Sequence, residues 1–235
     1  MKRKSIYIND IPAILWGDVS DKVYLYIHGQ GGNKEEVSNF SDVICRNGWQ
    51  ILSIDLPEHG ERMNENKYFV PWDILPELTS IMEYSESNWR EISLFANSIG
   101  AWFSMLGFNN MQLKHCFFLS PVTDMEYLIS KMMSLENVTE QRLKEELIIP
   151  TSHGQTLSWK YWEYVLSHPI TKWNVPTKIL YGEQDHLIER KVVDKFSHEF
   201  SCELTIFEKG EHWFHTEQQL DFVSEWIEKR VVTQN

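Results

Sequence analysis

Ser98 lies in a segment whose residue types suit a nucleophilic serine. An apolar run, Ile92–Phe95, leads into Ala96-Asn-Ser-Ile-Gly100, and a helical pattern follows. In a strand–turn–helix of this kind, strand and helix backbones nearly touch, so the residues two positions before and after the serine must be very small. Ala96 and Gly100 meet that condition, although glycine is usual at both positions. The segment predicts a nucleophile at Ser98, and a plain glycine turn is the alternative.

Two further polar residues follow apolar runs downstream. Asp185 comes after the run 178–181, and His212 comes after the run 204–207. A serine hydroxyl needs a base within hydrogen-bond reach, and an imidazole base needs a carboxylate to fix its tautomer and stabilise its charged form. The chain order Ser98, Asp185, His212 is one in which such triads occur. We therefore predict that these three residues are catalytic.

Neighbouring residues offer alternatives for two of these roles. Asp124 also follows an apolar run and is a second candidate for the acid, behind Asp185. His215 is a second candidate for the base, behind His212. The two histidines could also be read as a metal pair, but no third ligand with suitable spacing accompanies them. We expect neither a metal ion nor a cofactor.

A glycine-rich turn could stabilise negative charge on a reacting carbonyl oxygen. The segment Tyr26-Ile-His-Gly-Gln-Gly-Gly32 ends an apolar run. Acyl transfer develops an oxyanion, and two backbone N–H groups aimed at it lower the barrier by several kcal/mol. We expect the oxyanion-hole donors to be the N–H groups of Gln30 and of Ile99, the residue after the nucleophile. A phosphate-binding turn is the weaker alternative, because the glycine spacing of such motifs is absent.

The elements that must position these residues alternate along the chain. A hairpin over residues 5–16 is followed by apolar runs at 23–27, 50–54, 92–95, 116–119, 178–181 and 204–207. Runs that are apolar on both faces are typical of buried parallel strands. Strands that alternate with helices indicate an α/β fold with a mostly parallel sheet covered on both faces. Ligands bind such sheets at the carboxyl ends of the strands, where the candidate residues lie.

Four helical patterns separate the runs. Asn33 with Glu36 predicts the start of a helix whose apolar stripe runs from Val37 to Ile44. Further apolar stripes lie over 74–82 and 192–200. Thr216 and Gln219 form a capping box that opens a last helix.

A long insertion departs from this alternation. Residues 123–173 separate two predicted strands, are helical in pattern, and are too long for a simple crossover. We interpret them as a helical cap inserted within a single domain of residues 1–235, the alternative being an ordinary crossover helix with a decorated loop. Trp159 and Trp162 are candidate substrate-binding residues in this segment. Burial between cap and body is the other interpretation of the two tryptophans.

The composition of the chain argues against several classes of binding partner. The chain has 34 acidic and 22 basic residues and a formal net charge of -12, which would repel a phosphate backbone, so nucleic acid is not expected as a partner. Neither a run long enough to cross a bilayer nor a signal-peptide pattern occurs in the sequence, and we expect a cytoplasmic protein without a membrane partner. Three widely spaced cysteines favour neither a disulfide framework nor a zinc site.

The motifs together resemble the α/β-hydrolase superfamily over nearly the whole chain. They are similar in particular to small single-domain bacterial esterases of the dienelactone-hydrolase-like and prolyl-oligopeptidase-like branch. The motifs are His28-Gly-Gln-Gly-Gly, Asp55-Leu-Pro-Glu-His-Gly60, Ala96-Asn-Ser-Ile-Gly, Gly182-Glu-Gln-Asp and Gly210-Glu-His. The resemblance implies an eight-stranded sheet with an antiparallel second strand and an insertion after the sixth. It also implies that the segment from Asp55 to Gly60 is structural and borders the site.

These observations predict a serine hydrolase that cleaves carboxylic esters of small molecules through an acyl-enzyme intermediate. Peptide, amide and thioester hydrolysis use the same triad and stay open as alternatives. A ligand-binding protein without turnover is the alternative from another class. The sequence also leaves a homodimer open.

Overall fold

An eight-stranded sheet forms the centre of the protein in the computed structural model, which describes residues 1–152 and 154–231. Its order is β1-β2-β4-β3-β5-β6-β9-β10. The strands are β1 (Arg3–Ile8), β2 (Ile11–Trp16), β3 (Lys22–Ile27), β4 (Gln50–Ile54), β5 (Glu91–Asn97), β6 (Cys116–Leu119), β9 (Thr177–Gly182) and β10 (Glu203–Phe207).

The strand directions follow the sequence prediction. β2 pairs antiparallel with both β1 and β4, and every other neighbouring pair is parallel. β3, β4, β5 and β6 are almost entirely buried, which explains why these segments are apolar on both faces. The α/β class, the eight strands and the antiparallel second strand are confirmed.

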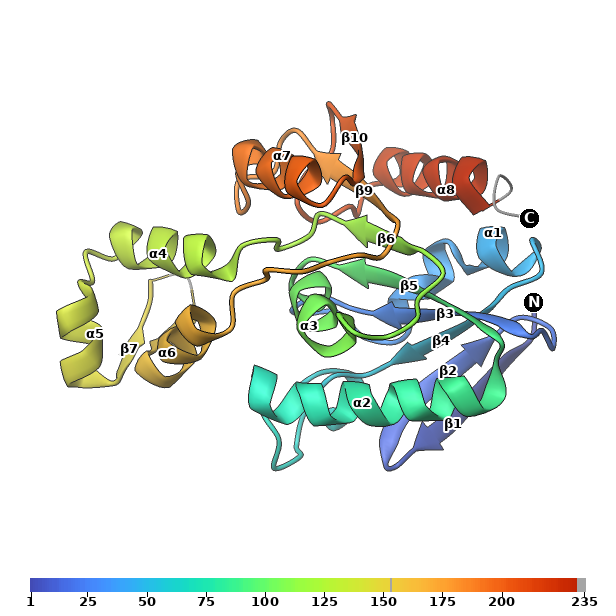
Figure 1. The fold of residues 1–235 in the computed structure, drawn as a ribbon, viewed down its shortest axis with the longest axis horizontal. Coiled ribbons are helices and arrows are strands. Elements are labelled where there is room, and N and C mark those ends of the chain that lie inside the picture. Colours follow the sequence, from blue (N-terminus) through green and yellow to red (C-terminus); the bar gives the residue numbers. More distant parts are fainter. Residues whose placement is uncertain (153, 232–235) are drawn as a thin grey trace.

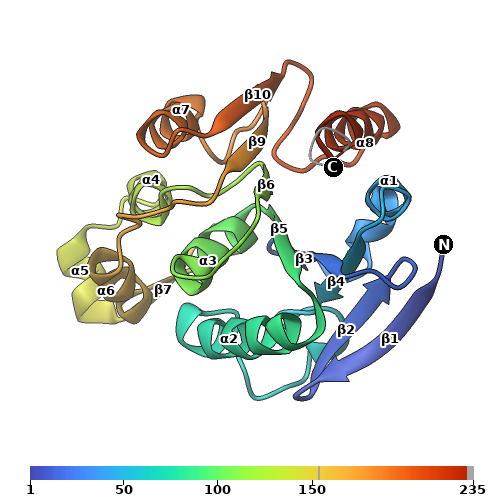
Figure 2. The same ribbon diagram turned by 45° about the vertical axis from the view of Figure 1, so that its right-hand side comes forward.

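Helices cover both faces of the sheet (Figures 1 and 2). Side chains of α2, α3 and α7 pack in one hydrophobic core, and side chains of α1 and α8 pack in a second. No helix in the described part of the chain has the length and apolar content needed to span a membrane. The helices outside the insertion are η1 (Glu36–Asn39), α1 (Ser41–Cys45), η2 (Gly60–Arg62), α2 (Pro71–Asn88), α3 (Ile99–Phe108), α7 (Arg190–Glu199) and α8 (Glu217–Val231).

The capping box before α8 forms as predicted. The Gln219 N–H donates to Thr216 Oγ1 over 3.3 Å, and the Thr216 N–H donates to Gln219 Oε1 over 3.4 Å. These reciprocal bonds satisfy N–H groups that the first helical turn leaves without partners. The helix then buries Val223, Trp226 and Ile227 against the sheet.

The continuous helix predicted from Asn33 onward is wrong. The structure contains the 3₁₀ turn η1 and the five-residue helix α1 instead. Asn33 Oδ1 accepts a hydrogen bond from the Glu35 N–H, while the Glu36 carboxylate accepts one from the Tyr26 hydroxyl over 2.9 Å. Asn33 thus makes the side-chain bond of an N-cap, whereas Glu36 bonds to Tyr26 and not back to Asn33. The apolar stripe from Val37 to Ile44 is buried as expected.

The segment between β6 and β9 is more varied than its helical pattern predicted. It contains three helices and a short antiparallel β-ribbon, and in Figure 1 its helices lie beyond the end of the sheet at which β6 ends. Its elements are α4 (Met125–Leu135), α5 (Glu140–Glu146), β7 (Ile148–Pro150), β8 (Thr156–Ser158) and α6 (Trp159–Ser167). We call residues 123–173 the insert, and its role as a cap stays a prediction.

Candidate active site

Ser98 forms a sharp turn between β5 and α3. Its backbone angles, φ 52° and ψ -124°, are rare for a residue other than glycine. The Ser98 N–H donates to the Leu119 carbonyl, and the Ser98 carbonyl accepts from the Val122 N–H, each over 3.0 Å. These bonds to the end of β6 and to the segment after it hold the strained residue in place.

The small residues that flank Ser98 have the predicted steric role. A Cβ added to Gly100 would lie 2.5 Å from the carbonyl oxygens of both Ile27 and His28, which are backbone atoms of the neighbouring strand and its loop. Position 100 therefore requires glycine. Ala96 is fully buried, so the structure accommodates a methyl group at the first small position.

Three side chains predicted to be catalytic form one hydrogen-bonded chain. Ser98 Oγ lies 2.8 Å from His212 Nε2, and His212 Nδ1 lies 2.7 Å from Asp185 Oδ2. Asp185 follows β9 and His212 follows β10, so neighbouring parallel strands deliver both residues to the carboxyl-end edge. The arrangement has the connectivity that nucleophilic catalysis by serine requires.

The Asp185 carboxylate is held on both oxygens. Its Oδ1 accepts hydrogen bonds from the N–H groups of Leu187 and Ile188, over 2.8 Å and 2.9 Å, and its Oδ2 faces His212. The carboxylate side chain is 0% exposed and the imidazole side chain is 20% exposed. Asp185 is therefore fixed in orientation, while His212 keeps access to solvent.

The second candidates for the acid and the base, Asp124 and His215, bond to other residues. Asp124 is the N-cap of α4, where its Oδ1 accepts from the Tyr127 N–H over 2.9 Å. His215 Nδ1 lies 2.8 Å from the Trp213 carbonyl, and its ring stacks on Trp213. Among the described residues, no group of three or more His, Cys, Asp or Glu side chains is arranged to hold a metal ion.

The two N–H groups predicted as oxyanion donors are both available. Within the described residues, neither the Gln30 N–H nor the Ile99 N–H has a hydrogen-bond acceptor. Ile99 begins α3, so its N–H lies at the positive end of the helix dipole. The loop that carries Gln30 lies against the nucleophile, since a Cβ added to Gly29 would come within 2.9 Å of Ser98 Cβ.

Two buried histidines lie behind this loop. His28 Nδ1–H donates to the Gly29 carbonyl over 2.7 Å, and its Nε2 accepts from the Leu56 N–H over 3.0 Å. Burial lowers the pKa of His28 to about 4, so it is neutral near neutral pH. His59 Nε2 accepts from the Gly31 N–H over 2.8 Å.

Buried ion pairs involve the segment after β4, which the family resemblance implied to be structural and to border the site. The Asp55 carboxylate is fully buried and accepts from the Lys34 side chain and, over 2.8 Å, from the Lys34 N–H. Arg62 binds Glu77 through two hydrogen bonds, of 2.6 Å and 2.7 Å. The ionisable residues Glu58, His59 and Arg62 predicted a salt-bridged loop here, with a border to the substrate as the alternative, and Arg62 is indeed ion-paired.

Trp159 and Trp162 lie on α6 of the insert. Trp162 is buried in the same core as α3, and Trp159 is half-buried with the Lys144 ammonium 5.5 Å from its ring centre. The structure does not place either ring in the hydrogen-bonded chain of Ser98. Their assignment to substrate binding stays a prediction.

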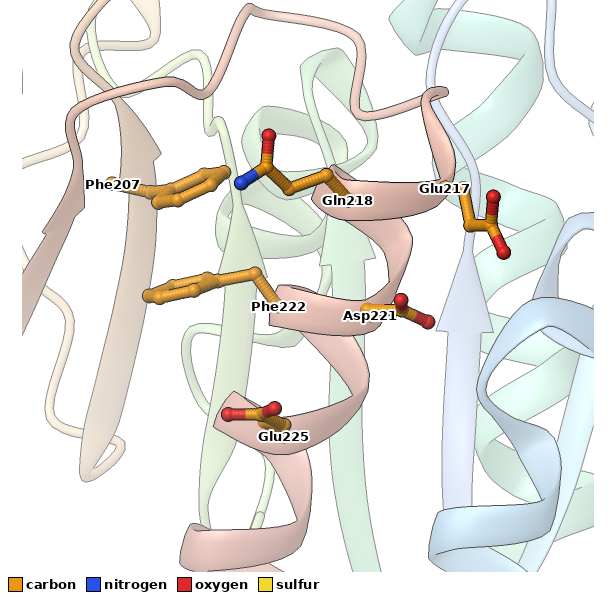
Figure 3. A pocket seen from close by; sticks show the side chains of 6 residues that line it. All are labelled: Phe207, Glu217, Gln218, Asp221, Phe222 and Glu225. Atoms are coloured by element: carbon orange, nitrogen blue, oxygen red, sulfur yellow. The ribbon is translucent and has the colours of Figure 1, made fainter.

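A hollow between β10 and α8 is lined by none of the triad residues (Figure 3). Phe207 and Phe222 stack in it with ring centres 4.1 Å apart, and four polar side chains of α8 complete its lining. Those four are Glu217, Gln218, Asp221 and Glu225.

The sheet order, the turn at Ser98 and the insertion after the sixth strand define an α/β-hydrolase fold. Residues 122–219 match the family model described as the alpha/beta hydrolase fold. The resemblance seen in the motifs is thus confirmed at the level of the superfamily fold, whereas the esterase branch stays a prediction. No curated protein sequence matches the chain.

Solved structures of low sequence identity share the fold over nearly the whole chain. Est1E from Butyrivibrio proteoclasticus with bound ferulic acid is 18% identical, with a TM-score of 0.80 and 98% of each chain covered. Mouse alpha/beta hydrolase domain-containing protein 10 is 10% identical, with a TM-score of 0.80 and 100% of each chain covered. A monoacylglycerol lipase from Paleococcus ferrophilus is 14% identical, with a TM-score of 0.71 and coverage of 96% of this chain and 99% of the other.

Proposed function

We propose that the protein is a serine hydrolase that cleaves carboxylic esters of small molecules. The observation that carries the proposal is the hydrogen-bonded chain from Ser98 Oγ through His212 to Asp185 Oδ2. A serine held at a strained turn, paired with an imidazole that is itself bonded to a fixed carboxylate, is suited to attack on an acyl carbon.

The reaction follows from the contacts. His212 Nε2 takes the proton of Ser98 as Oγ attacks the ester carbonyl, and the carbonyl oxygen becomes an oxyanion held by the N–H groups of Gln30 and Ile99. His212 then gives the proton to the leaving alcohol, which leaves an acyl group on Ser98. Water, deprotonated by His212, then attacks the acyl carbon. As the bond from that carbon to Ser98 Oγ breaks, His212 returns the proton to Oγ, which releases the acid and the free serine. Asp185 stays ionised throughout and orients the imidazole.

The structural neighbours support hydrolysis of esters over other chemistry. One of them is a monoacylglycerol lipase, and another holds ferulic acid, which is a carboxylic acid such as ester hydrolysis releases. Amide and thioester substrates would use the same groups, so a substrate screen must include them. The cytoplasmic location, the absence of nucleic-acid and membrane partners, and the homodimer left open by the sequence stay predictions.

Hydrolysis of p-nitrophenyl esters of graded acyl length tests the proposal. We expect turnover by the wild type and a loss of about 10⁴-fold or more in Ser98→Ala and His212→Ala, because removal of one triad member disables the others. His215→Ala, which removes a nearby exposed histidine, is the matched control and should keep full activity.

Labelling with a fluorophosphonate probe separates the alternatives. Labelling at Ser98 together with turnover of amides or thioesters, but not esters, would move the proposal to another substrate class. A wild-type protein that neither turns over any of these substrates nor labels at Ser98 would be a binding protein on the same fold, and the proposal would fail.

A further inference from the structure

The peptide group that carries the Gln30 N–H is held at its carbonyl oxygen, which belongs to Gly29. The Gly29 carbonyl belongs to the same planar peptide, and it accepts both the His28 Nδ1–H, over 2.7 Å, and the Gly32 N–H, over 3.1 Å. Holding the carbonyl oxygen of a planar peptide also sets the direction of its N–H. His28 and Gly32 together therefore restrain one of the two peptide groups of Gln30.

The next peptide along the loop is held by His59. Gly31 has a φ of 77°, a conformation that glycine adopts without steric cost, and its N–H donates to His59 Nε2 over 2.8 Å. Without this bond, the peptide that joins Gln30 to Gly31 could rotate, because glycine has no side chain to restrict it. The orientation of Gln30 thus depends on contacts to both of its peptide groups.

His59 is itself held in the tautomer that this bond needs. Its Nδ1 lies 2.8 Å from the Pro57 carbonyl, which can only accept, so Nδ1 carries the proton and Nε2 is left as an acceptor. The ring packs between Phe69 and His28, with ring centres 4.4 Å and 5.0 Å away, and the residue is 8% exposed. The acceptor is therefore buried and preorganised.

A second contact docks the same two segments. The Lys34 N–H donates to Asp55 Oδ1 over 2.8 Å, and the Glu61 N–H donates to Asp55 Oδ2 over 3.0 Å. A Cβ at Gly60 would lie 2.3 Å from the Asp55 carboxylate, so the chain packs closely around this group. The loop 29–34 is thus bonded to the segment 55–61 at two points, through Gly31 to His59 and through Lys34 to Asp55. Of these two loop residues, Gly31 is the closer in sequence to Gly29, which lies against Ser98.

We propose that His59 is a positioning residue that holds the Gln30 N–H in the direction of the developing oxyanion, through its bond to Gly31. This inference rests on the proposed function, because it assigns a role to the loop only if an oxyanion forms at Ser98. His59 does not contact the reacting atoms. Its effect is confined to the preorganisation of a backbone donor, which acts in the transition state and hardly in the ground state.

Two substitutions at His59 separate this role from simple packing. His59→Leu removes the acceptor and keeps apolar bulk, and we expect kcat to fall about 10- to 100-fold with KM changed less than about threefold. His59→Gln offers an amide oxygen to the Gly31 N–H, and we expect it to recover at least a third of the lost activity on a logarithmic scale. Met63→Ala, an exposed change in the same segment, is the control and should match the wild type.

Thermal melting and circular dichroism establish that each variant is folded. If His59→Leu does not fold, His59→Met repeats the comparison with an unbranched side chain. The affinity for a trifluoromethyl ketone, which forms an oxyanion adduct with serine, should fall in parallel with kcat/KM, whereas binding of the carboxylate product should not change.

The results distinguish the two proposals. A wild type that hydrolyses esters, with folded Leu and Met variants that keep kcat within about twofold, would overturn the positioning role and leave the proposed function intact. A rise in KM at constant kcat, or equal losses in the Leu and Gln variants, would also overturn it. A wild type without turnover and without labelling at Ser98 would instead remove the proposed function.

Discussion

Two buried histidines should make the protein lose stability in mild acid. His28 and His115 are both nearly inaccessible, and burial lowers the pKa of His28 to about 4 and that of His115 to about 3, below the ordinary value of 6.5. His115 lies in a cluster with Tyr24, Trp49 and Phe117, and its Nε2 forms a hydrogen bond with the Tyr24 hydroxyl. Both rings are therefore neutral in the folded protein well below pH 6.

The direction of the effect follows from proton binding. Between the pKa of the folded protein and that of the unfolded chain, the unfolded chain binds more protons, so the free energy of unfolding rises with pH. Stability is fully present above about pH 6.5 and is lost as the pH falls toward 4. Each histidine contributes a slope that approaches about 1.4 kcal/mol per pH unit below pH 6, or roughly 2 kcal/mol in total between pH 6.5 and 4.5.

Urea denaturation followed by tryptophan fluorescence at several pH values between 4.5 and 7.5 measures this slope. The lower limit stays above the ordinary pKa values of aspartate and glutamate. Together the two histidines should remove roughly 4 kcal/mol, which is a large part of the stability of many domains. We expect unfolding to begin above pH 4.5 for this reason.

A pair of variants isolates the contribution of His115. His115→Gln removes the titrating ring, so its slope should be about 1.4 kcal/mol per pH unit smaller than that of the wild type, whatever the variant's stability at pH 7.5. Tyr24→Phe perturbs the same cluster but keeps the ring, and should keep the wild-type slope. Equal slopes in His115→Gln and the wild type would refute the reasoning for this residue.

Two further predictions concern packing and buried charge. Gly100→Ala should prevent folding or lower the melting temperature by more than 10 °C, because the added methyl group would lie 2.5 Å from two backbone carbonyl oxygens. Soluble yield and thermal melting measure this effect, and a melting temperature close to that of the wild type would contradict it. Glu77→Ala leaves the Arg62 guanidinium buried without its bidentate partner, and should cost about 3–5 kcal/mol in urea denaturation. The exposed change Glu83→Ala on the same helix is its control, and a cost below 1 kcal/mol for Glu77→Ala would show that Arg62 finds other partners.

Local sequence patterns predicted those parts of the fold whose contacts are themselves local. The buried strands are apolar on both faces because helices cover the sheet on both sides, and the box of Thr216 and Gln219 is closed by residues three apart. The helix expected from Asn33 is interrupted at Phe40, whose backbone is not helical and whose ring packs against Tyr26 and Phe95 of the sheet. The ribbon of β7 and β8 was missed because three-residue strands carry almost no periodicity.

The same distinction applies to the site. The meeting of Ser98, Asp185 and His212 in one hydrogen-bonded chain could be predicted, because parallel strands bring their carboxyl ends to one edge of the sheet. The support behind them could not be predicted in the same way. The bond between Gly31 and His59 joins residues 28 positions apart, and the bond between Lys34 and Asp55 joins residues 21 positions apart. No local sequence pattern predicts a hydrogen bond between residues so far apart.

The separation of the triad along the chain has a consequence for synthesis on the ribosome. Ser98 precedes His212 by 114 residues, and β6, the insert, β9 and β10 must all be made and placed before the imidazole can reach the serine. At ordinary translation rates, on the order of ten seconds pass between these two residues. The nascent chain thus carries Ser98 without its imidazole partner throughout that interval. The hydrolysis proposed above would then report the closure of the last sheet edge rather than the folding of the first strands.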